Sequence, residues 1–275
     1  MKQKCIFIVG ACSGIGLSYA KHLSALGHRV YASAINEKKS KELQQKLPKA
    51  IVVILDLRMA SDINQCCSFL ANEVSALDAL ICNSGIPIGG PVSHLALEQL
   101  REVFQVNVFG HIELVQRLLV LLQKSQDPRL VWTGSAAGYF VRPLLGGYAA
   151  SKFAVTAIMD ALRVELYNQI HVSHIMPGGI RTDIWTKGVE AATALEDQIG
   201  LEDYHTALRK LKEEAQHNAK NAASVQKVVH AMHHALFSSN PKPTYRIGLD
   251  AHLAYWLKWL LPQRLVDWLL RKLCW

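Results

Sequence analysis

The sequence has no long hydrophobic run, which excludes membrane-spanning helices at the outset. Although 50% of its 275 residues are hydrophobic, no stretch reaches the roughly 18 to 20 apolar residues that such a helix needs. The basic start, Met1 to Lys4, precedes an apolar run at 5–9 that is too short for a signal peptide. We therefore expect a cytoplasmic protein whose six cysteines are reduced thiols.

Linkers, repeats and metal-binding spacings are also missing. No tract rich in Pro, Gly or Ser divides the chain, so we expect one domain over 1–250 and an amphipathic extension at 251–275. The adjacent Cys66 and Cys67 have no second cysteine pair at metal spacing, and the histidines at 230–234 have no acidic or cysteine partner. We therefore predict no metal site.

Charge is sparse and has no strong pattern. Only 19% of the residues are charged, and the net charge is +8. Such a balance suits nucleic acid, an anionic membrane or an anionic ligand. The basic residues are spread along the chain, without a Lys/Arg stripe interleaved with exposed aromatic residues, which disfavours nucleic acid as a partner.

What the sequence does contain is an alternation of short apolar runs and helical patterns. Strands are predicted at 5–9, 30–34, 51–55, 79–82, 130–133 and 172–176, with a last short strand at 243–248. Helices are predicted at 15–26, 37–47, 63–74, 97–122 and 148–167. This order favours an α/β fold, a Rossmann-like doubly wound parallel sheet of about seven strands with helices on both faces.

The segment 183–220 interrupts this rhythm. It is polar, highly charged and helical in pattern, and it follows the last central strand. An excursion of this length is typical of a lid over a site, so we predict a substrate lid there. Asn221 is the expected N-cap of a helix at 222–237.

A glycine-rich turn follows the first predicted strand. It runs Gly10-Ala11-Cys12-Ser13-Gly14-Ile15-Gly16, with the spacing G-x-x-x-G-x-G. Glycines permit a tight turn and let backbone N–H groups approach a pyrophosphate at a helix N-terminus. Further along, Asp56 and Leu57 end the third strand, and Asn83-Ser84-Gly85 end the fourth. These strand ends lie where open α/β sheets bind their ligands, so a nucleotide site is predicted.

A second group of residues indicates proton transfer. Tyr148 and Lys152 are four residues apart, which places both on the same face of a helix that the pair Gly146-Gly147 opens. A free phenol has a pKa near ~10, and a neighbouring ammonium group lowers it. With a nucleotide site, this pair predicts hydride transfer on an alcohol or ketone, which needs a proton donor.

Together these pieces resemble the short-chain dehydrogenase/reductase family, in its short single-domain branch. The match covers roughly residues 4 to 182, in the order of the family and close to its spacings. The matching residues are Gly10, Gly14, Gly16, Asp56, Asn83, Ser84, Gly85, Asn107, Ser135, Tyr148, Lys152, Pro177 and Gly178. Within the family, the segments 10–17 and 29–32 are most similar to hydroxysteroid and retinol dehydrogenases.

The resemblance implies a role for each of these residues. Tyr148 would be the general acid/base, and Lys152 would lower its pKa and bind the nicotinamide ribose. Ser135 would hydrogen-bond the substrate oxygen, and Asn107 would hold a water that relays protons from Lys152. After the sixth strand, Pro177, Gly178, Ile180 and Thr182 would contact the nicotinamide and its phosphates.

Two departures bear on the cofactor loops. Val9 replaces the Thr that in this family helps to tie the loops together, so we expect a less rigid loop. In this family an acidic residue at the end of the second strand binds the ribose of NAD, and an arginine just after it often pairs with the 2′-phosphate of NADP. The segment 31–36 has neither, but Ser13 and Ser33 are able to donate hydrogen bonds to a phosphate. Lys38 and Lys39 are close in sequence, which favours NADP, with NAD as the alternative.

The last 25 residues are rich in tryptophan, leucine and basic residues. Two short amphipathic helices separated by Pro262 fit an interfacial membrane anchor. Packing against the lid of the chain itself, or against a second subunit, are the alternatives. By resemblance, a homo-oligomer through helices 97–122 and 148–167 is expected.

The substrate is expected to be a lipophilic alcohol or ketone. Its pocket is predicted to be lined by Leu144, Leu145, Ala149, Ile184 and Trp185. Two other functions remain open: a binding protein that senses the dinucleotide without turnover, and an epimerase or dehydratase on a nucleotide sugar. The intact set of Asn, Ser, Tyr and Lys argues against the first, and the glycine spacing and short C-terminal part argue against the second.

Overall fold

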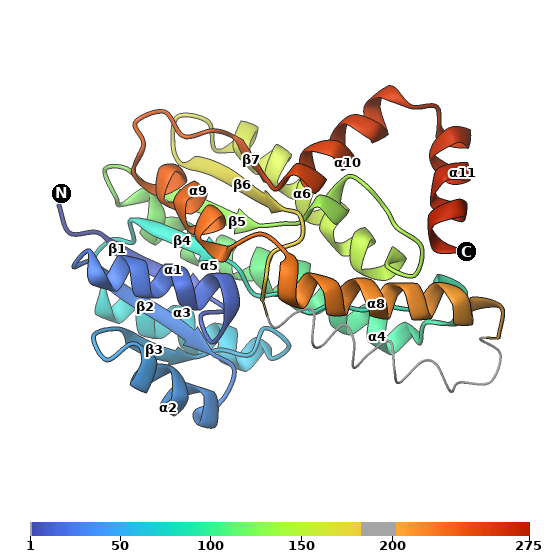
Figure 1. The fold of residues 1–275 in the computed structure, drawn as a ribbon. Helices are drawn as coiled ribbons and strands as arrows, with labels where there is room; N and C mark the ends of the chain where they lie inside the picture. Colours follow the sequence, from blue (N-terminus) through green and yellow to red (C-terminus); the bar gives the residue numbers. More distant parts are fainter. Residues whose placement is uncertain (1, 183–201) are drawn as a thin grey trace.

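The computed structural model describes residues 2–182 and 202–275, and its centre is a parallel sheet of seven strands. The strands are β1 (Cys5–Val9), β2 (Arg29–Ala34), β3 (Ile51–Ile54), β4 (Ala79–Cys82), β5 (Arg129–Thr133), β6 (His171–Pro177) and β7 (Thr244–Ile247). Their order across the sheet is β3-β2-β1-β4-β5-β6-β7, and every neighbouring pair is parallel (Figure 1). The predicted fold class is confirmed.

Helices cover both faces of this sheet. One layer holds α1 (Gly14–Ala25), α2 (Glu37–Lys46) and α9 (Val225–Phe237). The other holds α3 (Ala60–Glu73), α5 (Gly110–Gln123) and α6 (Gly146–Glu165) (Figure 1). Around these layers lie α4 (Leu97–Phe104), α8 (His205–Asn221), α10 (Leu249–Leu260) and α11 (Gln263–Cys274).

The alternation of side chains along each strand explains why the strands are apolar throughout. Successive residues of a strand point to opposite faces of the sheet. In β1, Phe7 and Val9 pack in the layer of α3, α5 and α6, whereas Ile6 and Ile8 pack in the layer of α1, α2 and α9. All four side chains are fully buried, as expected for a parallel sheet covered on both faces.

Several element boundaries shift by one to three residues from the prediction, and two helices differ more clearly. The expected helix 97–122 contains a π-helical turn at Gln105–Phe109 between α4 and α5. The expected N-cap at Asn221 is wrong, because Asn221 ends α8, and the hydroxyl of Ser224 accepts the N–H of Gln226 to cap α9. The reason is a tertiary contact: Ala223 pairs with Ile180 in an extended bridge, so the chain cannot be helical there.

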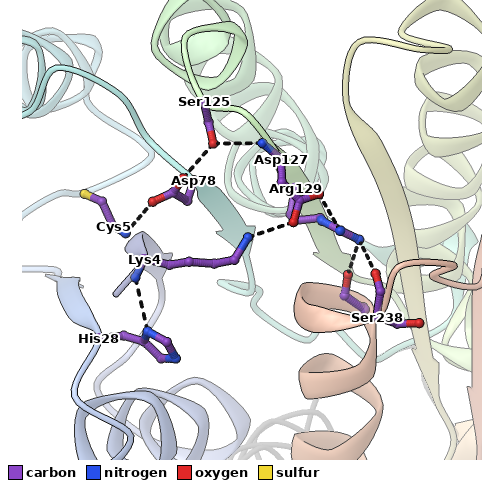
Figure 2. A network of polar contacts seen from close by, with 9 residues as sticks. Lys4, Cys5, His28, Asp78, Ser125, Asp127, Arg129 and Ser238 are labelled. Atoms are coloured by element: carbon purple, nitrogen blue, oxygen red, sulfur yellow. Dashed lines mark hydrogen bonds and ion pairs between the residues drawn. The ribbon is translucent and has the colours of Figure 1, made fainter. Parts of the chain in front are cut away.

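Two basic residues at the amino-terminal edge of the sheet form ion pairs and hydrogen bonds with neighbouring residues. Figure 2 shows Lys4 and Arg129 converging on the carboxylate of Asp127, with Lys4 Nζ 2.9 Å from Oδ2. The buried guanidinium of Arg129 also donates to the carbonyl of Ser238 at 3.0 Å. Close by, Asp78 accepts the N–H of Cys5 at 2.7 Å. These charges therefore join the strand ends opposite the candidate site.

Part of the predicted lid lies outside the described residues. Of the segment 183–220, the structure describes a short turn at Glu202–Tyr204 and α8, both helical. Ile184 and Trp185, two predicted pocket residues, are outside the described part. The lid and the division at residue 250 stay predictions. Among residues 2–182 and 202–275, no helix combines the length and apolar character needed to cross a bilayer.

Candidate active site

A cavity of about 700 Å³ lies at the carboxyl ends of the strands and brings most of the predicted site residues together. Seventeen of the nineteen predicted residues line it: Gly10, Ser13, Gly14, Ile15, Ser33, Asp56, Leu57, Asn83, Ser84, Gly85, Ser135, Tyr148, Lys152, Pro177, Gly178, Ile180 and Thr182. The two that do not line it are Gly16 and Asn107. Both residues are buried and do not line the cavity.

The glycine-rich turn is built as a close-packed loop at the start of α1. Gly10 has φ +82°, and a Cβ there would lie 2.5 Å from Ser84 Oγ. A Cβ on Gly16 would lie 2.1 Å from the carbonyl oxygen of Gly10, so Gly16 allows the helix to approach the turn. Ser13 precedes α1 without a side-chain cap hydrogen bond. The first-turn N–H groups of α1 thus fit an anionic group such as a pyrophosphate.

Position 9 is a valine rather than the threonine expected from the family, and hydrogen bonds from Asn83 connect this loop to β5. Its Nδ2 donates to the carbonyl of Gly10 at 3.0 Å, and its Oδ1 accepts the hydroxyl of Thr133 at 3.0 Å. The hydroxyl oxygen of Ser33 accepts the N–H of Gly10 at 2.9 Å. Both backbone polar groups of Gly10 are therefore hydrogen-bonded, and the expected loss of loop rigidity stays a prediction.

Asp56 and its neighbour Arg58 form the far wall of the cavity. Arg58 donates to both carboxylate oxygens of Asp56, with Nη2 2.6 Å from Oδ2, and it also contacts Glu102 at 3.0 Å. The hydrogen bonds from Arg58 hold the pKa of Asp56 below its ordinary value, so Asp56 is an anion at neutral pH. Arg58 also lines the cavity, but no motif in the sequence predicted this position.

The loop after β6 is held by a residue from α10. The N–H of Gly179 donates to Oδ2 of Asp250 at 2.5 Å. A Cβ on Gly178 would lie 2.2 Å from the same oxygen, which explains why glycine is needed there. Asp250 lines the cavity, but it lies too far along the sequence from this loop for any spacing pattern to reveal it.

Tyr148, Lys152 and Ser135 converge on the cavity from two elements. The helix α6 begins at Gly146, as predicted, so Tyr148 and Lys152 share one face. Lys152 Nζ lies 5.7 Å from the centre of the Tyr148 ring. Ser135 follows β5, accepts the N–H of Ala137 at 3.1 Å and hydrogen-bonds the hydroxyl of Tyr148.

Burial controls the charge states of this group. Removal of water raises the pKa of Tyr148 to about 12, and the hydrogen bond with Ser135 opposes that rise. Burial also lowers the pKa of Lys152 to about 8, while its Nζ donates to the carbonyl of Thr133 at 3.3 Å. The net pKa of Tyr148 is therefore above its ordinary value, and the lowering of this pKa by the Lys152 cation stays a prediction. Tyr148 therefore carries its proton at neutral pH.

Asn107 supports the site from behind. It is fully buried in the π-helical turn, and its Oδ1 accepts the N–H of Ile86 at 2.8 Å. Its Nδ2 donates to the carbonyl of Ile86 and to the hydroxyl of Ser151. A Cβ on Gly85 would lie 3.4 Å from both Asn107 Oδ1 and Lys152 Nζ, so the two side chains are close neighbours. The proposed water relay stays a prediction.

One part of the cavity wall carries many apolar side chains. Its lining there includes Ile88, Phe140, Leu145, Leu211, Leu253 and Leu257. Of the predicted pocket residues, Leu145 lines this cavity and Leu144 lines a neighbouring one. Ala149 lines neither and is fully buried, because it follows Tyr148 by one residue and so turns about 100° away on the helix.

The histidines at 230–234 have packing partners in the structure. His234 Nδ1 lies 2.7 Å from the hydroxyl of Tyr245, and His233 Nδ1 lies 3.2 Å from Nε2 of His22. Within the described part of the chain, no group of three His, Cys, Asp or Glu side chains is arranged to hold a metal ion.

With this geometry established, the sequence can be compared with known proteins. A family model described as short chain dehydrogenase matches residues 4–193. The chain is 30% identical to the NADPH-dependent 3-dehydrocapnine reductase of Ornithobacterium rhinotracheale, over 94% of this chain and 93% of that protein. It is also 30% identical to retinol dehydrogenase 7 of Mus musculus, over 97% of this chain and 87% of that protein.

A solved structure shows the same fold. A short-chain dehydrogenase/reductase from Burkholderia phymatum, in complex with NAD, superposes with a TM-score of 0.79. The two sequences are 21% identical, and the match covers 96% of this chain and 94% of that one. At this identity the likeness concerns the fold alone.

The tie between Thr133, Asn83 and Gly10 gives a first prediction. Thr133→Val removes the hydroxyl and leaves Asn83 Oδ1 unpaired, whereas Thr133→Ser keeps the hydrogen bond. The Val variant is expected to bind NADPH about 5- to 30-fold more weakly, since a lost hydrogen bond of this kind costs about 1–2 kcal/mol. Fluorescence titration gives the Kd. Equal Kd values for the Val variant, the Ser variant and the parent protein would contradict the role of this tie.

Proposed function

Because this chain belongs to the short-chain dehydrogenase family, we propose that it transfers a hydride between NADP(H) and a lipophilic alcohol or ketone, with Tyr148 as the general acid/base. The protein is an NAD(P)-dependent oxidoreductase. The observation that carries the finer proposal is the convergence of Tyr148, Ser135 and Lys152 in the cavity that the glycine-rich turn also lines.

The residues of the cavity fit a dinucleotide. The N-terminus of α1 would hold the pyrophosphate, and Asp56 and Leu57 would lie along the adenine end. Lys152 would hydrogen-bond the nicotinamide ribose, and the loop from Pro177 to Thr182 would hold the nicotinamide. When bound, the dinucleotide supplies or accepts the hydride.

NADP is the favoured form of the cofactor. The strand β2 has no carboxylate at its end to repel a 2′-phosphate, and Ser13 and Ser33 line the cavity beside it. The positive charge of Lys39 acts on the thiol of Cys12, another lining residue, although Lys39 Nζ itself lies 2.7 Å from Glu42. The relative from Ornithobacterium is named as NADPH-dependent, which supports NADP; NAD remains the alternative.

The proton is moved by groups of the chain itself. Tyr148 keeps its proton at neutral pH, so in the reductive direction it donates that proton to the carbonyl oxygen as negative charge develops there. Ser135 would hold the same oxygen. With its pKa at about 8, Lys152 is mostly protonated at pH 7, and its charge stabilises the phenolate that Tyr148 becomes.

The apolar lining around Leu145 and Leu257 supports a lipophilic substrate. The likeness to a protein named retinol dehydrogenase 7 points the same way. A short polar sugar alcohol would leave this surface uncovered.

Replacement of the acid/base residue provides the main test. Tyr148→Phe is expected to lower kcat for carbonyl reduction at least about 100-fold, because the hydroxyl that donates the proton is gone. Its Kd for NADPH should stay within a few-fold of that of the parent. Oxidation of NADPH would be followed with a panel of steroid, retinoid and fatty carbonyls, and with NADH in parallel.

Tyr167→Phe is the matched control, since Tyr167 lies just beyond α6 and is 73% exposed. If Tyr148→Phe and Tyr167→Phe turn over equally, Tyr148 is not the acid/base. If the parent protein binds NADPH and reduces no carbonyl of the panel, the alternative of a non-catalytic dinucleotide sensor is favoured.

We also propose a peripheral membrane contact through 251–275, for a protein otherwise located in the cytoplasm. The inner face of α11 packs on α8, with Val266 and Cys274 buried. The opposite side of α10 and α11 leaves large apolar side chains exposed, including Trp256 at 55% and Trp259 at 71%. Basic residues accompany them: Lys258, Arg264, Arg271 and Lys272. Tryptophan with basic residues on short amphipathic helices suits an anionic membrane surface.

Loss of the exposed tryptophans is expected to weaken this contact. The double variant Trp256→Ser/Trp259→Ser should reduce the fraction bound to anionic phospholipid vesicles at least about fivefold, as each indole removes apolar area from the lipid interface. Leu97→Ser, which changes another exposed apolar residue, is the control. Co-sedimentation measures the bound fraction. Equal vesicle binding by the double variant and the control would show that residues 251–275 are not the membrane anchor.

A homo-oligomer is proposed through the outer faces of α5 and α6. Val120 is 61% exposed and Val164 is 72% exposed, and Phe109 and Phe153 are exposed nearby in the chain. An interface would cover these apolar side chains. The double variant Val120→Glu/Val164→Glu is expected to shift the protein to monomer in sedimentation velocity. A monomeric parent protein would rule the oligomer out.

A further inference from the structure

A second cavity, of about 840 Å³, lies beside the candidate active site. It is bounded by α8, α10, α11 and the loop that leads into α6, and it is partly open to solvent. Its wall is dominated by apolar side chains, among them Leu144, Ala207, Leu261, Val266, Leu269 and Leu270. None of the predicted catalytic or cofactor-binding residues lines it, so the activity proposed above leaves this cavity without a use.

The two cavities share a wall. Five residues line both of them: Phe140, Arg142, Leu211, Glu214 and Leu257. Of these, Leu211 and Glu214 belong to α8, and Leu257 belongs to α10. The two cavities are therefore neighbours, and a molecule bound at Tyr148 would reach the second cavity by passing these side chains.

The polar groups at this shared wall neutralise each other. Both terminal nitrogens of the Arg142 guanidinium donate to the two carboxylate oxygens of Glu214. The paired side chains are 37% and 34% exposed. Because the pair has no net charge, it offers no fixed charge to an ionic end of a ligand. Lys210, Glu213 and His217 also line the second cavity, but most of its lining side chains are apolar, which suits an uncharged, apolar segment of a molecule.

Space in the first cavity supports the same conclusion. Its volume of about 700 Å³ has to accommodate the dinucleotide as well as the reacting end of the substrate. A single ligand pocket commonly measures about 300–1,000 Å³, so little room remains there for a long substrate. The second cavity provides a comparable volume on the side away from the glycine-rich turn.

We propose that the second cavity binds the hydrocarbon tail of a long-chain substrate whose carbonyl or hydroxyl carbon lies at Tyr148. This inference rests on the proposed function and narrows its substrate class to lipids with an extended, uncharged chain. The tail passes the Arg142–Glu214 pair and packs against the leucines of α11. Each methylene that enters an apolar cavity gains about 0.8 kcal/mol, which is about fourfold in affinity.

A chain-length series tests the proposal. The parent protein with NADPH would be assayed on straight-chain 2-ketones from 2-hexanone to 2-tridecanone, at concentrations below their solubility limits. The value of kcat/KM is expected to rise about two- to fourfold per added methylene over part of the series. Leu270→Trp, which fills the second cavity, should lower kcat/KM for 2-tridecanone at least tenfold and for 2-hexanone less than twofold.

Leu265→Trp is the matched control, because Leu265 lies on the same helix and lines neither cavity. It should leave both ketones within twofold of the parent. If the ketones are reduced but kcat/KM does not depend on length, or if Leu270→Trp behaves like Leu265→Trp, the tail site is overturned and the oxidoreductase function stands. If no ketone is reduced, the substrate class in the proposed function fails.

Measurement of ligand binding in the absence of turnover tests the tail site independently of the enzyme assay. Calorimetric titration of 2-tridecanone into each variant, without dinucleotide, measures its affinity. Binding to the parent and to Leu265→Trp, with at least a tenfold weaker affinity for Leu270→Trp, supports the tail site. Equal affinities in all three proteins overturn it. Circular dichroism melting of both variants would show that the folded state is retained.

Discussion

Parallel pairing of all seven strands is the constraint on which the rest of this structure depends. It places every strand end that carries a functional residue at one edge of the sheet. Helices have to cover both faces of such a sheet, and the start of α1 is thereby brought to the same edge. Glycine at 10 and 16 then allows strand, turn and helix to approach closely enough for a nucleotide site.

Hydrogen bonds connect neighbouring strand ends at this edge. Asn83 joins the ends of β1 and β5 through Gly10 and Thr133, although position 9 is a valine. The carboxylate of Asp250 holds the loop after β6 in a comparable way, from the beginning of α10. The C-terminal helices are thus connected to the site by a direct contact and by the cavity wall that they share with it.

Desolvation shifts the pKa values of the proposed catalytic pair, Tyr148 and Lys152. Tyr148 and Lys152 are on one helix face, but the protein around them favours the neutral form of both side chains. A neutral phenol is able to donate a proton to a carbonyl oxygen. The pKa of Lys152 is about 8, so a small change in its surroundings would alter the fraction of Lys152 that is charged. An apolar substrate that displaces water from the cavity would strengthen the electrostatic interactions among these groups.

The sequence alone determined the features that depend on local spacing. Alternating strands and helices predicted the sheet, and the patterns around Gly10, Asn83, Tyr148 and Pro177 predicted part of the cavity wall. Tertiary structure decided the rest, because it depends on contacts between residues far apart in the chain. The bond from Thr133 to Asn83, the contact of Asp250 with Gly179 and the cap at Ser224 follow from how elements pack. The pKa of Tyr148 and the second cavity were also decided by packing, since solvent access and empty volume have no sequence pattern of their own.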